Sequence, residues 1–233
     1  ECLLSPAASV SQSGEDALLS GRSRWVSLLS EVLPRALLSE LGLARVLLGS
    51  SGGGQFLVVL PSEAGPEAER FFASASRQVR ELSGGRLHLV TASTENLGDW
   101  SVVRKRLGEE MQRNRGTPAA GQDAGFFAPF DGADAGVSEH FSKDLCLGFQ
   151  AAREIGWRPE DPARTLIDEG KHRWPLAQGL SLDAIAIARH TAMSDDGMAP
   201  ADLATLASRA QGRSAWGVLR GDVDNLGIRL RRA

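Results

Sequence analysis

Two acidic residues near the end of the chain have the spacing of metal ligands on a β-strand. The stretch GVLRGDVDNLG, residues 217–227, runs from an apolar segment into Asp222 and Asp224. Side chains at positions i and i+2 of a strand point to the same face, so these two carboxylates would converge where the strand ends. Hard cations such as Mg²⁺ prefer oxygen ligands and keep water and phosphate in the rest of their shell. The spacing therefore suits a two-metal nucleotidyl-transfer site, although Asp, Asn and Gly are equally the residues of an ordinary turn.

Two other acidic motifs fit this stretch less well. An EF-hand would need an oxygen ligand at its fifth position and Glu at its twelfth, where this chain has Leu226 and Ala233. A phosphatase of the D-x-D type also places its acids after an apolar strand. That fold needs a full Rossmann-like domain downstream, so it stays an alternative only for a piece of such an enzyme.

A second candidate for ligand binding is the glycine-rich stretch GSSGGGQF, residues 49–56. Backbone N–H groups in such a turn can cradle phosphate. A Walker loop would continue with Gly-Lys-Ser/Thr into a helix, whereas here Gln55 and Phe56 lead into an apolar, strand-like run. A flexible hairpin turn is the default interpretation.

The chain has 233 residues, of which 42% are hydrophobic and 24% charged, with a net charge of −3. A net charge this close to zero provides no overall positive field, so any binding of nucleic acid would need a local basic patch. The cationic residues around Arg104–Arg106 indicate a solvated helix face, with an RNA-facing patch as the weaker alternative. Two cysteines without a CxxC pair indicate a reduced, cytosolic protein, and no apolar run is long enough for a membrane span. The start at Glu1 rather than Met, together with a half-built motif at the end, predicts a piece of a longer protein.

Apolar periodicity predicts an α+β fold for the first half of the chain. The expected order is a helix, a β-hairpin, a helix, a strand and a helix, which is a ferredoxin-like layout without its first strand. These elements are expected at residues 24–41 (kinked or split at Pro34), 44–48 with 56–60, 66–82, 86–93 and 99–114. The second half reads as an irregular stretch at 115–143, a short helix over 144–157, a further irregular stretch, a helix at 199–210 and a buried strand into Asp222.

Three segments together resemble the large, palm-domain subunit of type III CRISPR effector complexes, of the Csm type. The first begins SGRSRWVSLLSEVLPRALL and runs through the GSSGGG turn to Leu-Pro; the others are LGFQAAREIG and LATLASRAQGRSAWGVLRGDVDNLGIRL. The resemblance covers most of residues 20–112 and 144–230. It implies four parts: a lead-in (1–20), a first ferredoxin-like palm (21–114), an insert (115–200) and the start of a second palm (201–233).

The resemblance also implies an activity. In this family two palms related to nucleotide cyclases bind ATP between them, and binding of target RNA switches on synthesis of cyclic oligoadenylate for antiviral defence. Carried over to this chain, Asp222 and Asp224 would be catalytic metal ligands for Mg²⁺ or Mn²⁺. Ser51, Gly52, Gly53 and Asn225 would contact the nucleotide. The implied partners are other effector subunits with guide and target RNA, and no membrane.

The chain departs from the family in several features. The opening strand of the first palm, the HD nuclease, the CxxC zinc ligands of the insert and the Gly-Gly-Asp-Asp hairpin of the second palm are all missing. The chain alone is therefore expected not to synthesise cyclic oligoadenylate. A non-catalytic scaffold of a ribonucleoprotein complex, in which DVDN is a turn, remains the alternative.

Overall fold

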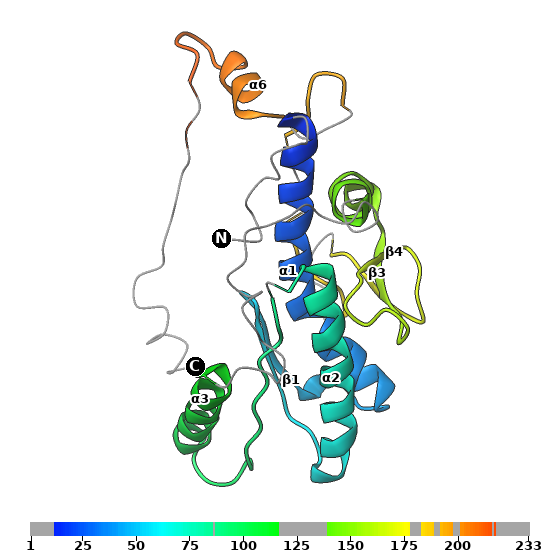
Figure 1. The fold of residues 1–233 in the computed structure, drawn as a ribbon, viewed down its shortest axis with the longest axis vertical. Coiled ribbons are helices and arrows are strands. Elements are labelled where there is room, and N and C mark those ends of the chain that lie inside the picture. Colours follow the sequence, from blue (N-terminus) through cyan, green and yellow to red (C-terminus); the bar gives the residue numbers. More distant parts are fainter. Residues whose placement is uncertain are drawn as a thin grey trace. The chain divides into compact units, whose positions relative to one another are not determined.

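The computed structural model describes residues 12–85, 87–116, 139–177, 183–188, 192–197, 201–215 and 217. The chain divides into two compact units, Glu1–His190 and Thr191–Ala233. Figure 1 shows that the first unit combines long helices with small sheets, both of them antiparallel. The predicted α+β class is thereby confirmed at this coarse level.

Helix α1, Gln12–Glu40, is a long helix that packs at the centre of the first unit. It begins earlier than predicted, so residues 12–20 are helical rather than a loose lead-in. The helix also continues through Pro34 without being split. Proline removes one backbone hydrogen bond from a helix, but burial of the surrounding apolar side chains outweighs that loss. The buried face contains Trp25, Leu28, Leu29, Val32, Leu33, Ala36, Leu37 and Leu38.

The predicted hairpin is confirmed, with its first strand shifted along the chain. Strand β1, Leu48–Gly52, pairs antiparallel with β2, Gln55–Val58. Residues Arg45–Leu47 form the 3₁₀ turn η2 instead of a strand. Within the described residues this sheet has only two strands.

Two further predicted helices are present on either side of an extended segment. After the 3₁₀ turn η3 (Ser62–Ala64), α2 spans Gly65–Leu82, and α3 spans Trp100–Gly116. The strand predicted at 86–93 does not form in the described part, residues 87–93, where no backbone ladder partner is found. Leu87 and Leu89 pack against the core instead. Trp100, the first residue of α3, is 53% exposed.

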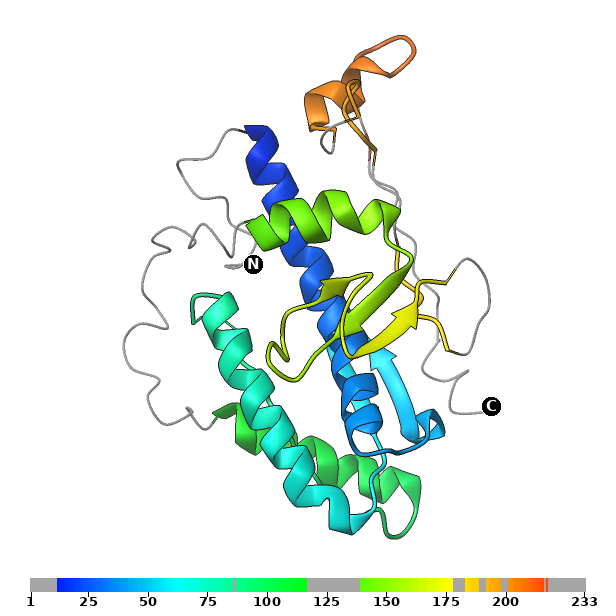
Figure 2. The ribbon, with the colours of Figure 1, turned by 90° about the vertical axis from the view of Figure 1, so that its right-hand side faces the viewer.

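Residues 139–177 differ most from the prediction. A wide π-type helix, η5 (His140–Gly148), continues into the short α5 (Phe149–Ala151), and the two together cross α1 in Figure 2. The helix predicted through Trp157 therefore ends at Ala151. A three-stranded antiparallel sheet in the order β4-β3-β5 follows, where the sequence indicated a helix end and an irregular stretch. Its strands are β3 (Glu154–Trp157), β4 (Leu166–Ile167) and β5 (His172–Pro175).

One hydrophobic core joins α1 to this later segment. Trp25 is fully buried, its ring lies 5.3 Å from that of Phe141, and its indole Nε1 donates a hydrogen bond of 2.8 Å to the carbonyl of Ala163. Ile155 and Trp157 of β3 belong to the same cluster. Residues assigned by the resemblance to a first palm and to an insert thus share a core, and the boundary at 114/115 stays a prediction.

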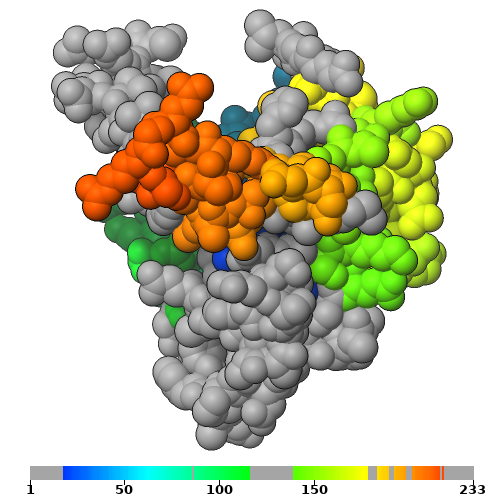
Figure 3. All heavy atoms as spheres, turned by 90° about the horizontal axis from the view of Figure 1, so that it is seen from above, coloured from blue at the N-terminus to red at the C-terminus, as the bar shows by residue number. Residues whose placement is uncertain are grey.

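The second unit has one described helix, α6 (Leu203–Ser208), inside the predicted range. The carboxylate of Asp202 caps it by accepting a 2.6 Å hydrogen bond from the backbone N–H of Thr205, and this bond lowers the pKa of Asp202. Arg209 closes a loop by binding Asp195 at 2.7 Å. Residues 201–215 are the orange surface in Figure 3. The strand predicted to run into Asp222 lies outside the described residues.

Candidate functional site

The turn between β1 and β2 is the described part of the predicted nucleotide site. Gly52, Gly53 and Gly54 all have positive φ, at 127°, 61° and 76°. Positive φ at both loop residues, Gly53 and Gly54, matches the right-handed twist of the two strands. A side chain at any of these three positions would meet open space, so glycine is required by the backbone conformation and not by crowding.

This conformation leaves the tip of the hairpin accessible to a ligand. Gly52, Gly53 and Gly54 are exposed, while Ser51 is half-buried and pairs with Phe56 across the hairpin. A succession of glycines without side chains can bring backbone N–H groups close to a phosphate. The three predicted contact residues Ser51, Gly52 and Gly53 are thus adjacent at one turn, in a geometry that equally serves a plain hairpin.

The other predicted site residues, Asp222, Asp224 and Asn225, lie outside the described residues. Among those that are described, no group of three or more His, Cys, Asp and Glu side chains could hold a metal ion. The predicted metal ligands are therefore neither placed nor brought together with the β1–β2 turn here. In the same ranges no helix combines the length and apolar character needed to cross a bilayer.

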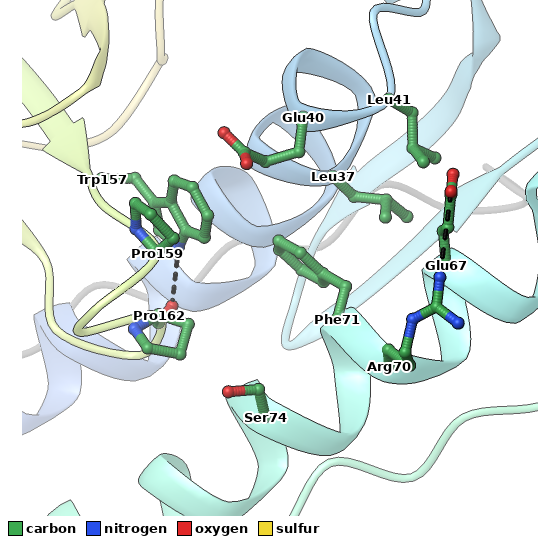
Figure 4. A pocket seen from close by; sticks show the side chains of 10 residues that line it. All are labelled: Leu37, Glu40, Leu41, Glu67, Arg70, Phe71, Ser74, Trp157, Pro159 and Pro162. Atoms are coloured by element: carbon green, nitrogen blue, oxygen red, sulfur yellow. Dashed lines mark hydrogen bonds and ion pairs between the residues drawn. The ribbon is translucent and has the colours of Figure 1, made fainter.

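A pocket of about 390 Å³ was not anticipated from the sequence. It lies between the end of α1, the first turns of α2 and the residues that follow β3 (Figure 4). Its walls are mostly apolar, with a few charged groups at the edge: Leu37, Glu40, Leu41, Glu67, Arg70, Phe71, Ser74, Trp157, Pro159 and Pro162. The lining residues come from three separate segments, and the sequence pattern gives no sign that these meet.

Aromatic stacking fixes the floor of this pocket. The ring of Trp157 stacks on the rings of Phe71 and His172, with distances of 5.5 Å and 5.9 Å between ring centres. The angles between the ring planes are 29° and 20°. The indole Nε1 of Trp157 donates a 2.9 Å hydrogen bond to the carbonyl of Pro162. Stacked rings of this kind stabilise a fold beyond the contribution of their buried area, so these contacts stabilise the floor of the pocket.

Glu40 supplies a fixed negative charge at the pocket's edge. Its Oε1 lies 2.6 Å from Lys171 Nζ and 2.5 Å from His172 Nε2. Burial alone would raise the pKa of Glu40, but the hydrogen bonds from Lys171 and His172 outweigh it and the pKa is lowered. Glu40 is therefore a carboxylate at neutral pH. The mostly apolar walls would accommodate a small apolar or planar group.

A buried histidine lies apart from this pocket, in η5. His140 is 1% exposed, its Nδ1 lies 3.2 Å from Asp144 Oδ2, and its Nε2 has no hydrogen-bond partner in the described part of the chain. Burial lowers the pKa of His140, and the opposing contribution of Asp144 is smaller. The ring is accordingly neutral at pH 7 and belongs to the core.

Comparison of this chain with models of protein families, with curated proteins and with solved structures found no match.

Proposed function

We propose that the chain is part of the large, palm-domain subunit of a type III CRISPR effector complex. In this proposal its β1–β2 turn and its DVDN motif contribute to a Mg²⁺–ATP site between two palms. The observation that carries the proposal is the hairpin itself. A turn with three left-handed glycines next to Ser51 lies between the long helix α1 and helix α2, at the place that the resemblance assigns to it.

The order of the described elements also supports a ferredoxin-like first palm. Helix α1, the hairpin, helix α2 and an extended segment at 87–93 follow one another as a split β-α-β layout requires after its first strand. In that layout the missing strand would lie between β2 and the segment 87–93. Its absence from the described residues accounts for a two-stranded sheet and an unpaired extended segment.

Asp222 and Asp224 would hold Mg²⁺ or Mn²⁺ in this site, with Asn225, Ser51, Gly52 and Gly53 against the nucleotide. The metal would supply charge neutralisation at the ATP phosphates. Backbone N–H groups at the glycine turn would bind phosphate oxygens. Guide RNA, target RNA and the other effector subunits would be the partners, and the cell interior the place of action.

Calorimetric titration of the purified chain with ATP, with and without Mg²⁺, tests the proposal. We expect Mg²⁺-dependent binding that Asp222→Ala weakens at least about tenfold, which corresponds to about 1.4 kcal/mol. Asp183→Ala is the matched control, because it removes the same charge from a carboxylate that is 86% exposed. Binding that is equal in Asp222→Ala and the unsubstituted chain would show that Asp222 is no ligand. The absence of any ATP binding would favour the scaffold alternative.

A further inference from the structure

Most side chains of helix α3 are exposed to solvent or only partly buried. Val103 is its one fully buried hydrophobic residue, at 3% exposure, among the residues that the structure describes. Trp100 and Val102 are 53% and 50% exposed, and Leu97 just before the helix is 68% exposed. Trp100 and Val102 lie about 200° apart around the helix, so they face different sides of it. An indole that is half exposed contributes little to the core and can contact a ligand.

Two arginines share one side of α3 with this tryptophan. At 100° per residue, a sector of about 80° contains Trp100, Arg104, Gly108, Met111 and Arg115. Met111 is half-buried, and the other four are exposed. Arg104 and Arg115 make no hydrogen bond or ion pair within the described residues. We call these four residues the Trp100 stripe.

The acidic side chains of α3 lie outside the Trp100 stripe. Glu109 pairs with Lys105 at 3.9 Å, and Glu110 pairs with Arg113, both on other sides of the helix. Arg106 is engaged as well, because its guanidinium donates to the carbonyls of Glu95 and Leu97 and holds the segment leading into the helix. The Trp100 stripe is therefore cationic without a compensating carboxylate, although the whole chain has a net charge of −3.

The chemistry and spacing of the stripe fit a single strand of nucleic acid. At 1.5 Å per residue, Trp100 lies about 6 Å along the axis from Arg104 and about 22 Å from Arg115. That length corresponds to roughly four nucleotides of an extended strand. An exposed indole can stack on any base, with each stacked base worth about 1–3 kcal/mol, while arginines neutralise neighbouring phosphates.

We propose that the Trp100 stripe binds single-stranded nucleic acid without sequence preference, through base stacking on Trp100 and phosphate contacts from Arg104 and Arg115. This surface is distinct from the β1–β2 turn. It would give the chain a direct contact to RNA, which deepens the proposed function, but its binding requires neither ATP nor Mg²⁺.

Fluorescence anisotropy of a labelled 12-nucleotide oligouridine tests this proposal on the purified chain at 50 and 200 mM salt. Trp100→Ala should weaken binding about 5- to 150-fold, as the loss of one stacked base implies. Arg104→Gln and Arg115→Gln should each weaken binding and reduce the slope of log K against log salt by about 0.7. Lys105→Gln and Arg113→Gln, on the other sides of the same helix, are the matched controls and should change little.

Several results would overturn the proposal. If the stripe and control variants lose the same affinity for oligouridine, the net charge of the helix explains the binding and the stripe does not. If no oligouridine binds at 50 mM salt, the proposed site does not exist. Binding to vesicles with phosphatidylserine but not to oligouridine would assign the stripe to a membrane surface. Thermal melting should match the unsubstituted chain in every variant, because each altered side chain is exposed. Asp222→Ala separates the two proposals, since it should impair ATP binding and leave oligouridine binding intact.

Discussion

Gly156→Ala should destabilise the first unit by about 3 kcal/mol or more, as severe overpacking does. A Cβ atom at this position would lie 1.5 Å from the carbonyl oxygen of Glu169 and 2.7 Å from its carbonyl carbon. Both are backbone atoms that cannot rotate away. Gly156 also lies in the central strand β3, paired with Leu166 on one side and Arg173 on the other. Equilibrium unfolding in urea, followed by circular dichroism, would measure the loss.

The matched control for this change is Gly108→Ala, the same substitution in the exposed face of α3. No atom lies within 4 Å of a Cβ built at Gly108. Alanine is favoured over glycine in a helix interior, so the control should stabilise the protein by about 0.5–1 kcal/mol. Equal stability of the two variants would contradict the close approach of Glu169 to β3.

Trp25→Ala should cost about 3–5 kcal/mol, the range for removing a large aromatic side chain from a core. Trp25 has no exposed surface, and its loss would also leave the buried carbonyl of Ala163 without its 2.8 Å hydrogen bond. The same urea titration, followed by the fluorescence of the remaining tryptophans, would measure this loss. The result bears on the fold because Trp25 joins α1 to residues 141 and 163, which the resemblance placed in another domain.

Two controls separate volume from hydrogen bonding at this position. Trp25→Phe keeps most of the apolar contact with Phe141 but loses the indole N–H, so a smaller cost of about 1–2 kcal/mol is expected. Trp100→Ala removes the same side chain from an exposed position and should stay within about 0.5 kcal/mol. If Trp25→Ala is no more harmful than Trp100→Ala, the core described between α1 and η5 is wrong.

The sequence pattern correctly predicts those elements whose structure depends mainly on their own residues. The apolar spacing of α2, with Pro66 at its start, predicts that helix to within a residue, and the glycine run predicts the β1–β2 turn. The tertiary context decided the rest. Residues 12–20 are poor in apolar periodicity, yet Leu18 is 5% exposed and extends the buried face of α1. The alternating segment at 87–93 has the sequence pattern of a strand, but the described residues include no neighbouring strand that pairs with it.

The sheet β4-β3-β5 shows why the structure of residues 139–177 was predicted poorly. Its strands are only two to four residues long. The segments that connect them have no strand pattern, so the sequence does not indicate that these strands pair. The pocket floored by Trp157 depends on the same long-range contacts and was missed for the same reason. Of the predicted site, the backbone of Ser51–Gly53 follows from glycine chemistry alone, and Asp222, Asp224 and Asn225 remain predictions.

In the proposed function, the glycine turn and the DVDN motif bind the same nucleotide. Nuclear magnetic resonance of the ¹⁵N-labelled chain with Mn²⁺–ATP tests this most directly, because the paramagnetic ion broadens signals of nearby amides. We predict selective broadening of Ser51–Gly53 together with Asp222–Asn225, and its loss at both places in Asp222→Ala. Broadening at only one of the two segments, or broadening that survives Asp222→Ala unchanged, would contradict the proposed site.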